Sequence, residues 1–138
     1  MAKYNELNIK MKTMFEEPAK TRLMRKVPVA IRIDGKAFHT FTRGFKRPFD
    51  PTLRETMKET MKALCENIQG CVFAYEQSDE ITLILTDYES ENSSAWFDYE
   101  VQKMCSIAAS LATMFFNKIF SNKVDYLKIN EGEDIKYI

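Results

Sequence analysis

Hydrophobic and polar positions alternate along the first third of the chain with two different periods. Residues 3–16 place apolar side chains at helical spacing and are followed by Pro18, so we expect a helix that stops there. Residues 27–33, "VPVAIRI", change to a period of two, which predicts a strand. One face of this strand carries Val29, Ile31 and Ile33. The other face carries Ala30, Arg32 and Asp34.

A second helix is expected directly after residue 50. Asp50 suits an N-cap, Pro51 suits the first helical turn, and Gly70 supplies a stop. The apolar stripe between them consists of Leu53, Met57, Met61, Leu64 and Ile68. The next apolar run, "CVFAY" at 71–75, is typical of a central strand. The polar "QSDE" and then "ITLIL" at 81–85 follow it, which predicts a hairpin.

A long third helix is expected to open at Ser93 or Ser94 and to run to about Phe120. The tail, residues 122–138, is polar and contains at most a short strand at 126–129. After the first helix the order is therefore β-α-β-β-α, five of the six elements of a ferredoxin-like unit. The closing strand has no candidate. The expected fold is one α+β domain over residues 1–138, an antiparallel sheet with helices on one face.

Composition and charge narrow this picture only slightly. Twenty basic residues balance twenty acidic ones, so any phosphate-binding surface must come from local clustering. The N-terminus does not resemble a signal peptide, and no run approaches membrane-spanning length, so a cytoplasmic protein without a membrane partner is expected. The three cysteines are Cys65, Cys71 and Cys105. Because they are odd in number and lack a C-x-x-C spacing, we expect reduced, mostly buried thiols rather than zinc ligands or disulfides.

Two carboxylates are expected to meet at one edge of the sheet. We expect the first strand to lie beside the strand that follows the second helix. Asp34 ends that first strand, and Asp79 lies in the neighbouring hairpin turn. Close carboxylates repel each other unless a cation holds them together. Magnesium does so through one or two carboxylates plus nucleotide phosphates, and two such ions about 4 Å apart suit nucleotidyl transfer.

The segment "DGKAFH", residues 34–39, could support this chemistry. Gly35 lets the backbone approach a ligand, and the N–H groups from Gly35 to His39 could form an anion-binding nest. Phe38 and His39 offer flat faces for a base. Positive charge for a triphosphate comes from Lys36, Lys46 and Arg47.

Each of these features has a plainer alternative. D-G is a common turn dipeptide, and "QSDE" is typical of hairpin turns. His39 could be a packed histidine, and Lys103 a solvated side chain rather than a phosphate contact. If Asp79 and Glu80 both begin the following strand, they point to opposite faces. Asp79 is then the better metal ligand, and Glu80 has either a direct role or a role in the turn.

Three stretches, "RIDGKAFHTF…FKRPFD", "FAYEQSDEITLIL" and "SSAWFDYEVQKMCSIAASLATMFF", resemble the tRNA-His guanylyltransferase family. The closer similarity is to its bacterial-type branch of reverse, 3′-to-5′ polymerases, and it runs from about residue 27 to residue 120. The resemblance implies a palm domain similar to those of polymerases and nucleotide cyclases. It also implies ATP and GTP as substrates, two Mg²⁺ ions, addition of nucleotides to the 5′ end of tRNA, and a homo-oligomer, commonly a tetramer.

Carried onto this chain, the resemblance assigns the metal to Asp34, the Gly35 carbonyl and Asp79, and catalysis to Asp34, Asp79 and Glu80. The nucleotide would be bound by Asp34, Gly35, Lys36, Ala37, Phe38, His39, Lys46, Ser78 and Asp79. This sequence departs from the family at Glu76, where glycine is common, and at residues 98–100, where arginines are common. The chain also ends before a further strand and helical region that family members have.

The expected function is therefore 5′-end repair of tRNA or guanylylation of tRNA-His. The alternatives are a nucleotide cyclase or a forward polymerase palm, and a nucleotide- or RNA-binding module without catalysis.

Overall fold

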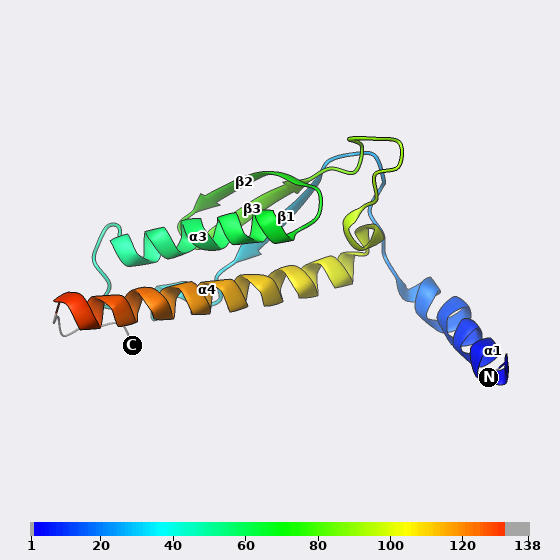
Figure 1. The fold of residues 1–138 in the computed structure, drawn as a ribbon, viewed down its shortest axis with the longest axis horizontal. Coiled ribbons are helices and arrows are strands. Elements are labelled where there is room, and N and C mark those ends of the chain that lie inside the picture. Colours follow the sequence, from blue (N-terminus) through cyan, green and yellow to red (C-terminus); the bar gives the residue numbers. More distant parts are fainter. Residues whose placement is uncertain (1, 132–138) are drawn as a thin grey trace.

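The computed structural model describes residues 2–131. Its helices and strands are α1 (Ala2–Met11), β1 (Val29–Asp34), α2 (Phe38–Phe41), α3 (Pro51–Asn67), β2 (Cys71–Gln77), β3 (Glu80–Leu85) and α4 (Val101–Glu131). Three short turns, η1 (Lys12–Glu16), η2 (Glu17–Ala19) and η3 (Trp96–Tyr99), join them. Figure 1 shows α3 and α4 side by side along the sheet, with α1 extending away from it. The expected α+β architecture is confirmed.

The three strands of the described residues form an antiparallel sheet in the order β1-β3-β2. The expectation that β1 pairs with the strand after α3 is wrong, because the hairpin places β3 between them. β2 is consequently an edge strand in this sheet rather than a central one. Phe73 and Tyr75 of β2 are 58% and 54% exposed, although the apolar run suggested a buried strand.

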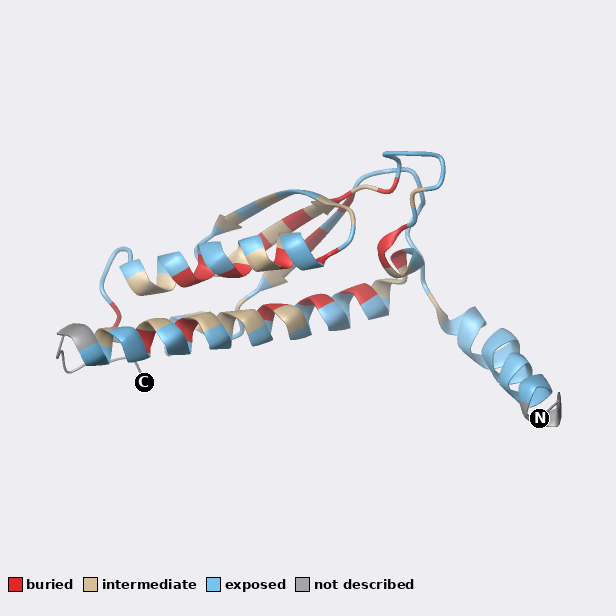
Figure 2. Cartoon of the chain, viewed as in Figure 1, coloured by how far each residue is buried: buried red, intermediate tan, exposed pale blue. Residues whose placement is uncertain are grey.

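One face of the sheet packs against α3 and α4 and forms the core, as Figure 2 shows by the buried residues along the facing sides of these elements. The predicted alternation in β1 is confirmed, since Val29 and Ile31 are buried while Arg32 is exposed. Leu83 and Leu85 of β3 have no exposed surface. Burial of each such side chain contributes about 1.5–3 kcal/mol.

The helix α3 begins and ends where the sequence predicts. The Asp50 carboxylate caps it by accepting the N–H of Leu53 at 3.0 Å. Beyond its end, Gly70 has φ +79°, and a Cβ there would lie 2.5 Å from the Thr86 carbonyl oxygen. A side chain at position 70 is therefore excluded both by backbone conformation and by space.

The start of the long helix differs from the prediction. Residues 97–99 have positive φ, and α4 begins only at Val101. The reason is a pairing with a distant segment. The N–H of Leu23 donates to the Tyr99 carbonyl at 3.1 Å, and the N–H of Val101 donates to the Thr21 carbonyl at 2.9 Å. These hydrogen bonds hold residues 97–101 out of a continuous helix.

The end of the long helix also differs from the prediction. α4 continues past Phe120 to Glu131, so residues 126–129 are helical and do not form a strand. The helix is extended because Phe120 and Val124 are buried against Phe45. The last part of the predicted tail, residues 132–138, lies outside the described residues.

Residues 101–129 of α4 are long and apolar enough to cross a membrane, judged by length and composition only. The sequence-based expectation that no segment has this property is therefore wrong. This length and composition are only weak support for a membrane span, because the long core helices of other proteins have them too. Met104, Ala108 and Ala112 of α4 belong to the main core.

The basic stretch at residues 20–26 is neutralised by acidic partners. The buried Asp87 carboxylate accepts hydrogen bonds from the Arg25 Nε–H and from the Lys26 N–H, the latter at 2.8 Å. Burial by itself would raise the pKa of Asp87, but these two hydrogen bonds and the Arg25 charge outweigh it and lower that pKa. Arg22 likewise pairs with Glu17 at 2.8 Å. This stretch therefore anchors the chain and does not present free charge.

Candidate functional site

The end of β1 and the β2–β3 turn are joined through their backbones. The N–H of Gly35 donates to the carbonyl of Asp79 at 3.1 Å, and Asp34 lies opposite Glu80 in the sheet register. The turn itself contains only Ser78 and Asp79, and Ser78 adopts φ +61°. Asp34 and Asp79, far apart in sequence, therefore lie at one edge of the sheet, as expected.

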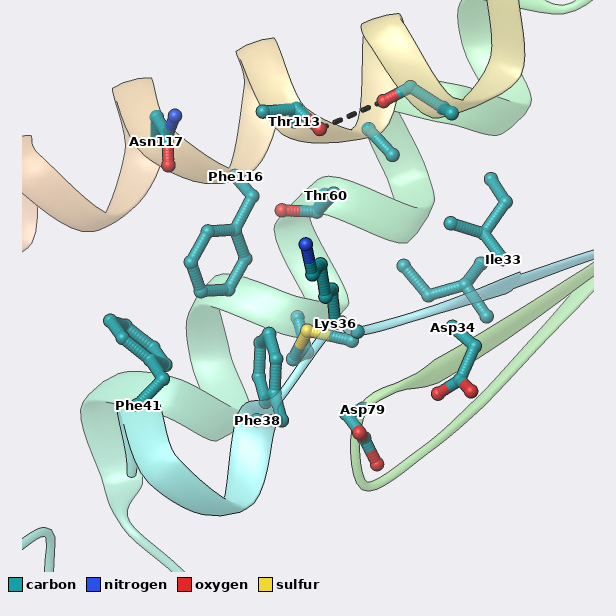
Figure 3. Close-up of a pocket in the computed structure, with 15 residues that line it drawn as sticks. Ile33, Asp34, Lys36, Phe38, Phe41, Thr60, Asp79, Thr113, Phe116 and Asn117 are labelled. Carbon is teal, nitrogen blue, oxygen red and sulfur yellow. Dashed lines mark hydrogen bonds between the residues drawn. The ribbon is translucent and has the colours of Figure 1, made fainter. Parts of the chain in front are cut away.

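A cavity of about 470 Å³ opens beside this edge. Its lining includes the two aspartates, Gly35, Lys36 and Phe38, together with residues of α3 and α4. In Figure 3 Asp34 and Asp79 lie on the same side of the cavity, and the Lys36 side chain extends toward the helices. Lys36 forms no ion pair with a carboxylate of the described residues. Among the described residues, the cavity therefore combines two acidic groups with one cation, Lys36, that has no ion-pair partner.

An aromatic ring excludes a side chain at position 35. A Cβ at this position would lie 2.3 Å from Cδ2 of Phe38. The Phe38 ring cannot move away easily, because it packs against Phe41 and Phe116 with centroid distances of 5.3 and 5.6 Å. Phe38 thus forms a fixed aromatic wall of the cavity.

The expected anion-binding nest is shorter than the sequence suggested. The N–H of Gly35 is already used by the Asp79 carbonyl. The N–H groups of residues 36–39 have no backbone acceptor within the described chain, and Ala37 has φ +54° and ψ +34°. A left-handed residue within such a turn is typical of nests that bind anions. As far as the described residues go, these four N–H groups near Asp34 are therefore available to an anion.

Several predicted site residues do not line the cavity. They are Ala37, His39, Lys46, Ser78 and Glu80. The carboxylate of Glu80 instead pairs with Arg32 at 3.2 Å on the sheet face opposite the helices. Lys103 lies in the first turn of α4 with its Nζ 5.0 Å from the Phe97 ring centroid, and it does not line the cavity either.

The donor atoms at this edge fit a hard cation whose coordination is completed by a ligand. The described residues contain no group of three His, Cys, Asp or Glu side chains that could hold a metal. Asp34 and Asp79 offer oxygen donors only, which is the type that Mg²⁺ prefers, and Mg²⁺ is commonly bound by one or two carboxylates plus phosphates. The residues present therefore fit magnesium delivered with a nucleotide.

Three polar residues of the cavity were missed by the sequence analysis. Thr60 comes from α3, and Thr113 and Asn117 come from α4. The Thr113 hydroxyl donates to the Ala109 carbonyl at 2.9 Å. The spacing of four between Thr113 and Asn117, which places both on one face of the helix, is the signal that could have identified them.

Comparison with known proteins gives consistent results. The sequence model of the family "Thg1: tRNAHis guanylyltransferase" matches residues 9–135. A probable tRNA(His) guanylyltransferase of Mus musculus is 30% identical over 84 residues, which are 59% of this chain and 26% of the mouse protein. Family members are nucleotidyltransferases.

Solved structures extend this similarity to the fold. A bacterial Thg1-like protein in complex with GTP has a TM-score of 0.76 and 40% identity, covering 83% of this chain and 54% of that one. The corresponding complex with ATP has a TM-score of 0.79 and 39% identity, covering 86% and 52%. The tRNA(His) guanylyltransferase from Saccharomyces cerevisiae shares the fold, with a TM-score of 0.66 and 23% identity. This match covers 78% of this chain and 46% of that one.

The chain spans about half the length of these solved structures and about a quarter of the mouse protein. The family match nevertheless covers nearly all of the chain, including both aspartates and the cavity-lining part of α4. This protein belongs to the tRNAHis guanylyltransferase family.

Proposed function

We propose that residues 1–138 form a palm-type catalytic domain that adds nucleotides to the 5′ end of tRNA. The observation that carries this proposal is the backbone link between Gly35 and Asp79, which holds Asp34 and Asp79 together beside a cavity. The cavity volume of about 470 Å³ lies within the usual range of small-molecule sites. The bacterial Thg1-like proteins solved with GTP and with ATP, at 40% and 39% identity, support a nucleotide as the ligand.

In this proposal the chain binds a nucleoside triphosphate by its phosphates. The Lys36 ammonium neutralises phosphate oxygens, and the N–H groups of Lys36 and Phe38, two residues of this segment that line the cavity, donate hydrogen bonds to them. The ring of Phe38 and the polar side chains of Thr113 and Asn117 line the space beside them. The nucleotide is thereby oriented with its reacting atoms toward Asp34 and Asp79.

The proposed reaction has two transfers. A tRNA 5′-monophosphate first attacks the α-phosphorus of ATP, which releases pyrophosphate and leaves an adenylylated end; a 5′-triphosphate would serve without this step. The 3′-hydroxyl of an incoming nucleotide then attacks the activated 5′ phosphorus, and AMP leaves. Two magnesium ions held by Asp34, Asp79 and the Gly35 carbonyl would supply activation of the attacking oxygen and stabilisation of the leaving one.

We further propose that the activity repairs the 5′ ends of tRNA and that the protein is located in the cytoplasm.

The chain is also proposed to self-associate, up to a tetramer. The first helical segment supports this self-association. Leu7, Met14 and Phe15 are 59%, 60% and 62% exposed on an arm that extends away from the sheet (Figure 1). Such clustered apolar side chains on a surface usually mark a contact with another polypeptide.

Calorimetric titration with ATP and GTP, with and without Mg²⁺, tests the site. Asp34→Asn and Asp79→Asn should each weaken magnesium-dependent binding at least about tenfold, which is ~1.4 kcal/mol. Asp125→Asn, an exposed aspartate of α4 outside the cavity, is the matched control and should bind normally. Circular dichroism confirms that each variant is folded. Binding that ignores both the metal and the two aspartates would refute the proposed site.

A second candidate function is nucleotide binding without transfer. It is favoured by the Arg32–Glu80 ion pair, which keeps a third carboxylate of this edge occupied. Extension assays with a 5′-truncated tRNA distinguish the two candidates, because only the transferase lengthens the 5′ end. A cyclic nucleotide or a lengthened 3′ end would instead indicate a cyclase or a forward polymerase.

A further inference from the structure

Two of the three thiols are in direct contact, and none of the three is fully buried, so the expectation of mostly buried cysteines is wrong. The Cys65 thiol in the last turns of α3 donates to the Cys71 sulfur at the start of β2, with 2.8 Å between the two Sγ atoms. Both are free and partly buried, while Cys105 is exposed on α4. The molecule thus contains a thiol pair and, on another element, a single thiol that serves as an internal reference.

The backbone between the pair is fixed at several points. The N–H of Ile68 donates to the Leu64 carbonyl at 2.9 Å, and the N–H of Cys71 donates to the Ile68 carbonyl at 3.2 Å. The Gly70 carbonyl accepts the N–H of Thr86 at 2.8 Å, which ties this connection to the end of β3. The contact between the thiols is therefore set by the main chain and does not depend on a loose loop.

One member of the pair can be reached from solvent. Cys65 lines a groove between α3 and β2 together with Lys58, Lys62 and Tyr75. Burial raises the pKa of Cys71 to about 12, and the hydrogen bond with Cys65 is a second, smaller cause. Cys71 therefore stays protonated at neutral pH. Because Cys65 lines the groove and Cys71 does not, the first attack on an oxidant falls to Cys65.

We propose that Cys65 and Cys71 form a reversible redox modification site that takes hydroperoxides as its oxidant. The Cys65 thiol gives up its proton and its sulfur attacks a peroxide oxygen, so an S–O bond forms and the O–O bond breaks; the departing hydroxide or alkoxide takes up that proton and leaves as water or an alcohol. The Cys71 sulfur then attacks the Cys65 sulfur. The S–S bond forms, the S–O bond breaks, and the departing hydroxide takes the Cys71 proton and leaves as water. A small dithiol or thiol reductant reverses the change by exchange.

The consequence of this modification would be a covalent link between α3 and β2. β2 leads directly into the turn that carries Asp79, so the link would fix the far end of that strand. The inference rests on the thiol geometry and is independent of the proposed transferase activity.

Peptide mass spectrometry tests this inference on the intact chain. The reduced protein is treated with hydrogen peroxide, alkylated under denaturing conditions and digested with trypsin. Residues 63–103 contain both Cys65 and Cys71 and no internal lysine or arginine, whereas residues 104–118 carry Cys105. We expect the first peptide to lose two hydrogens and to remain unalkylated, and to recover both alkylation sites after dithiothreitol. The Cys105 peptide should remain alkylated.

Two variants identify the order of the steps. In Cys71→Ser the sulfenic acid on Cys65 has no thiol to attack it, so dimedone should label Cys65 several-fold more than in the unchanged protein. In Cys65→Ser, Cys71 should remain unlabelled. Full alkylation of both cysteines at peroxide concentrations that oxidise Cys105 would overturn the proposal. A disulfide that involves Cys105, or equal dimedone labelling in both variants, would overturn it as well.

Discussion

Replacing Gly35 with alanine tests the claim that an aromatic ring sets the identity of this residue. The added Cβ would lie 2.3, 2.7 and 2.8 Å from Cδ2, Cε2 and Cγ of Phe38. An ordinary contact needs about 3.4 Å, so the ring or the backbone must retreat by about 1.1 Å. The ring is held by Phe41 and Phe116, so this retreat disturbs the aromatic cluster as well.

Overpacking of this size destabilises a protein by about 1–3 kcal/mol. For a chain of this length, that corresponds to a fall in melting temperature of roughly 4 °C per kcal/mol. Because Phe38 lines the cavity, we also expect Gly35→Ala to weaken nucleotide binding. The two effects have one cause, the displaced ring.

Urea unfolding of a double-mutant cycle is the decisive assay. In a Phe38→Ala background the Cβ at position 35 has room, so Gly35→Ala should cost less than about 0.5 kcal/mol there. The coupling between the two positions should then account for most of the cost measured in the unchanged protein. An equal cost in both backgrounds would show that backbone conformation, and not the Phe38 ring, makes Gly35 necessary.

Three further predictions concern other parts of the molecule. Asp87→Asn should lower the melting temperature at pH 7, and the difference from the unchanged protein should shrink as the pH falls below 3.8, the ordinary pKa. The hydrogen bonds to Asp87 lower its pKa, so its stabilising charge is lost only in that acidic range. A difference in melting temperature between the two proteins that stays constant with pH would contradict this reasoning. Arg32→Gln should release Glu80 from its exposed ion pair and lower the magnesium concentration for half-maximal nucleotide binding by up to about fivefold, because such pairs contribute at most about 1 kcal/mol. An unchanged magnesium titration would exclude a contribution from Glu80. Phe15→Glu should reduce the mass measured by light scattering toward that of a monomer, and an unchanged mass would exclude the arm from any assembly.

The parts of the fold that local signals determine were predictable from the sequence. The cap at Asp50 and the apolar stripe after it define α3, and the alternation around Ile31 defines β1. The position of β2 was not predictable from its own residues, because a short apolar run is equally compatible with a central strand and with an edge strand. The turn at residues 97–99 depends on hydrogen bonds to residues 21–23, which no local pattern contains.

The candidate site was predictable to the extent that topology determines it. Asp34 and Asp79 could be brought together because a β-α-β-β order places a strand end beside a hairpin turn. The contribution of α4 was missed, because only tertiary packing determines which polar residues of this helix face the cavity. The reason for Gly35 was also missed, since the ring that fills its space belongs to a residue whose rotamer the sequence does not specify.

The register of the sheet has a consequence for the order in which the protein folds. β2 and β3 are joined by a two-residue turn and can pair within microseconds, whereas β1 must find β3 across a loop of about 45 to 55 residues. The carboxylates of Asp34 and Asp79 meet only after this slower, long-range pairing is complete. Partly folded chains that contain the hairpin and α3 would therefore lack the acidic pair altogether, and nucleotide binding during refolding should report the arrival of β1.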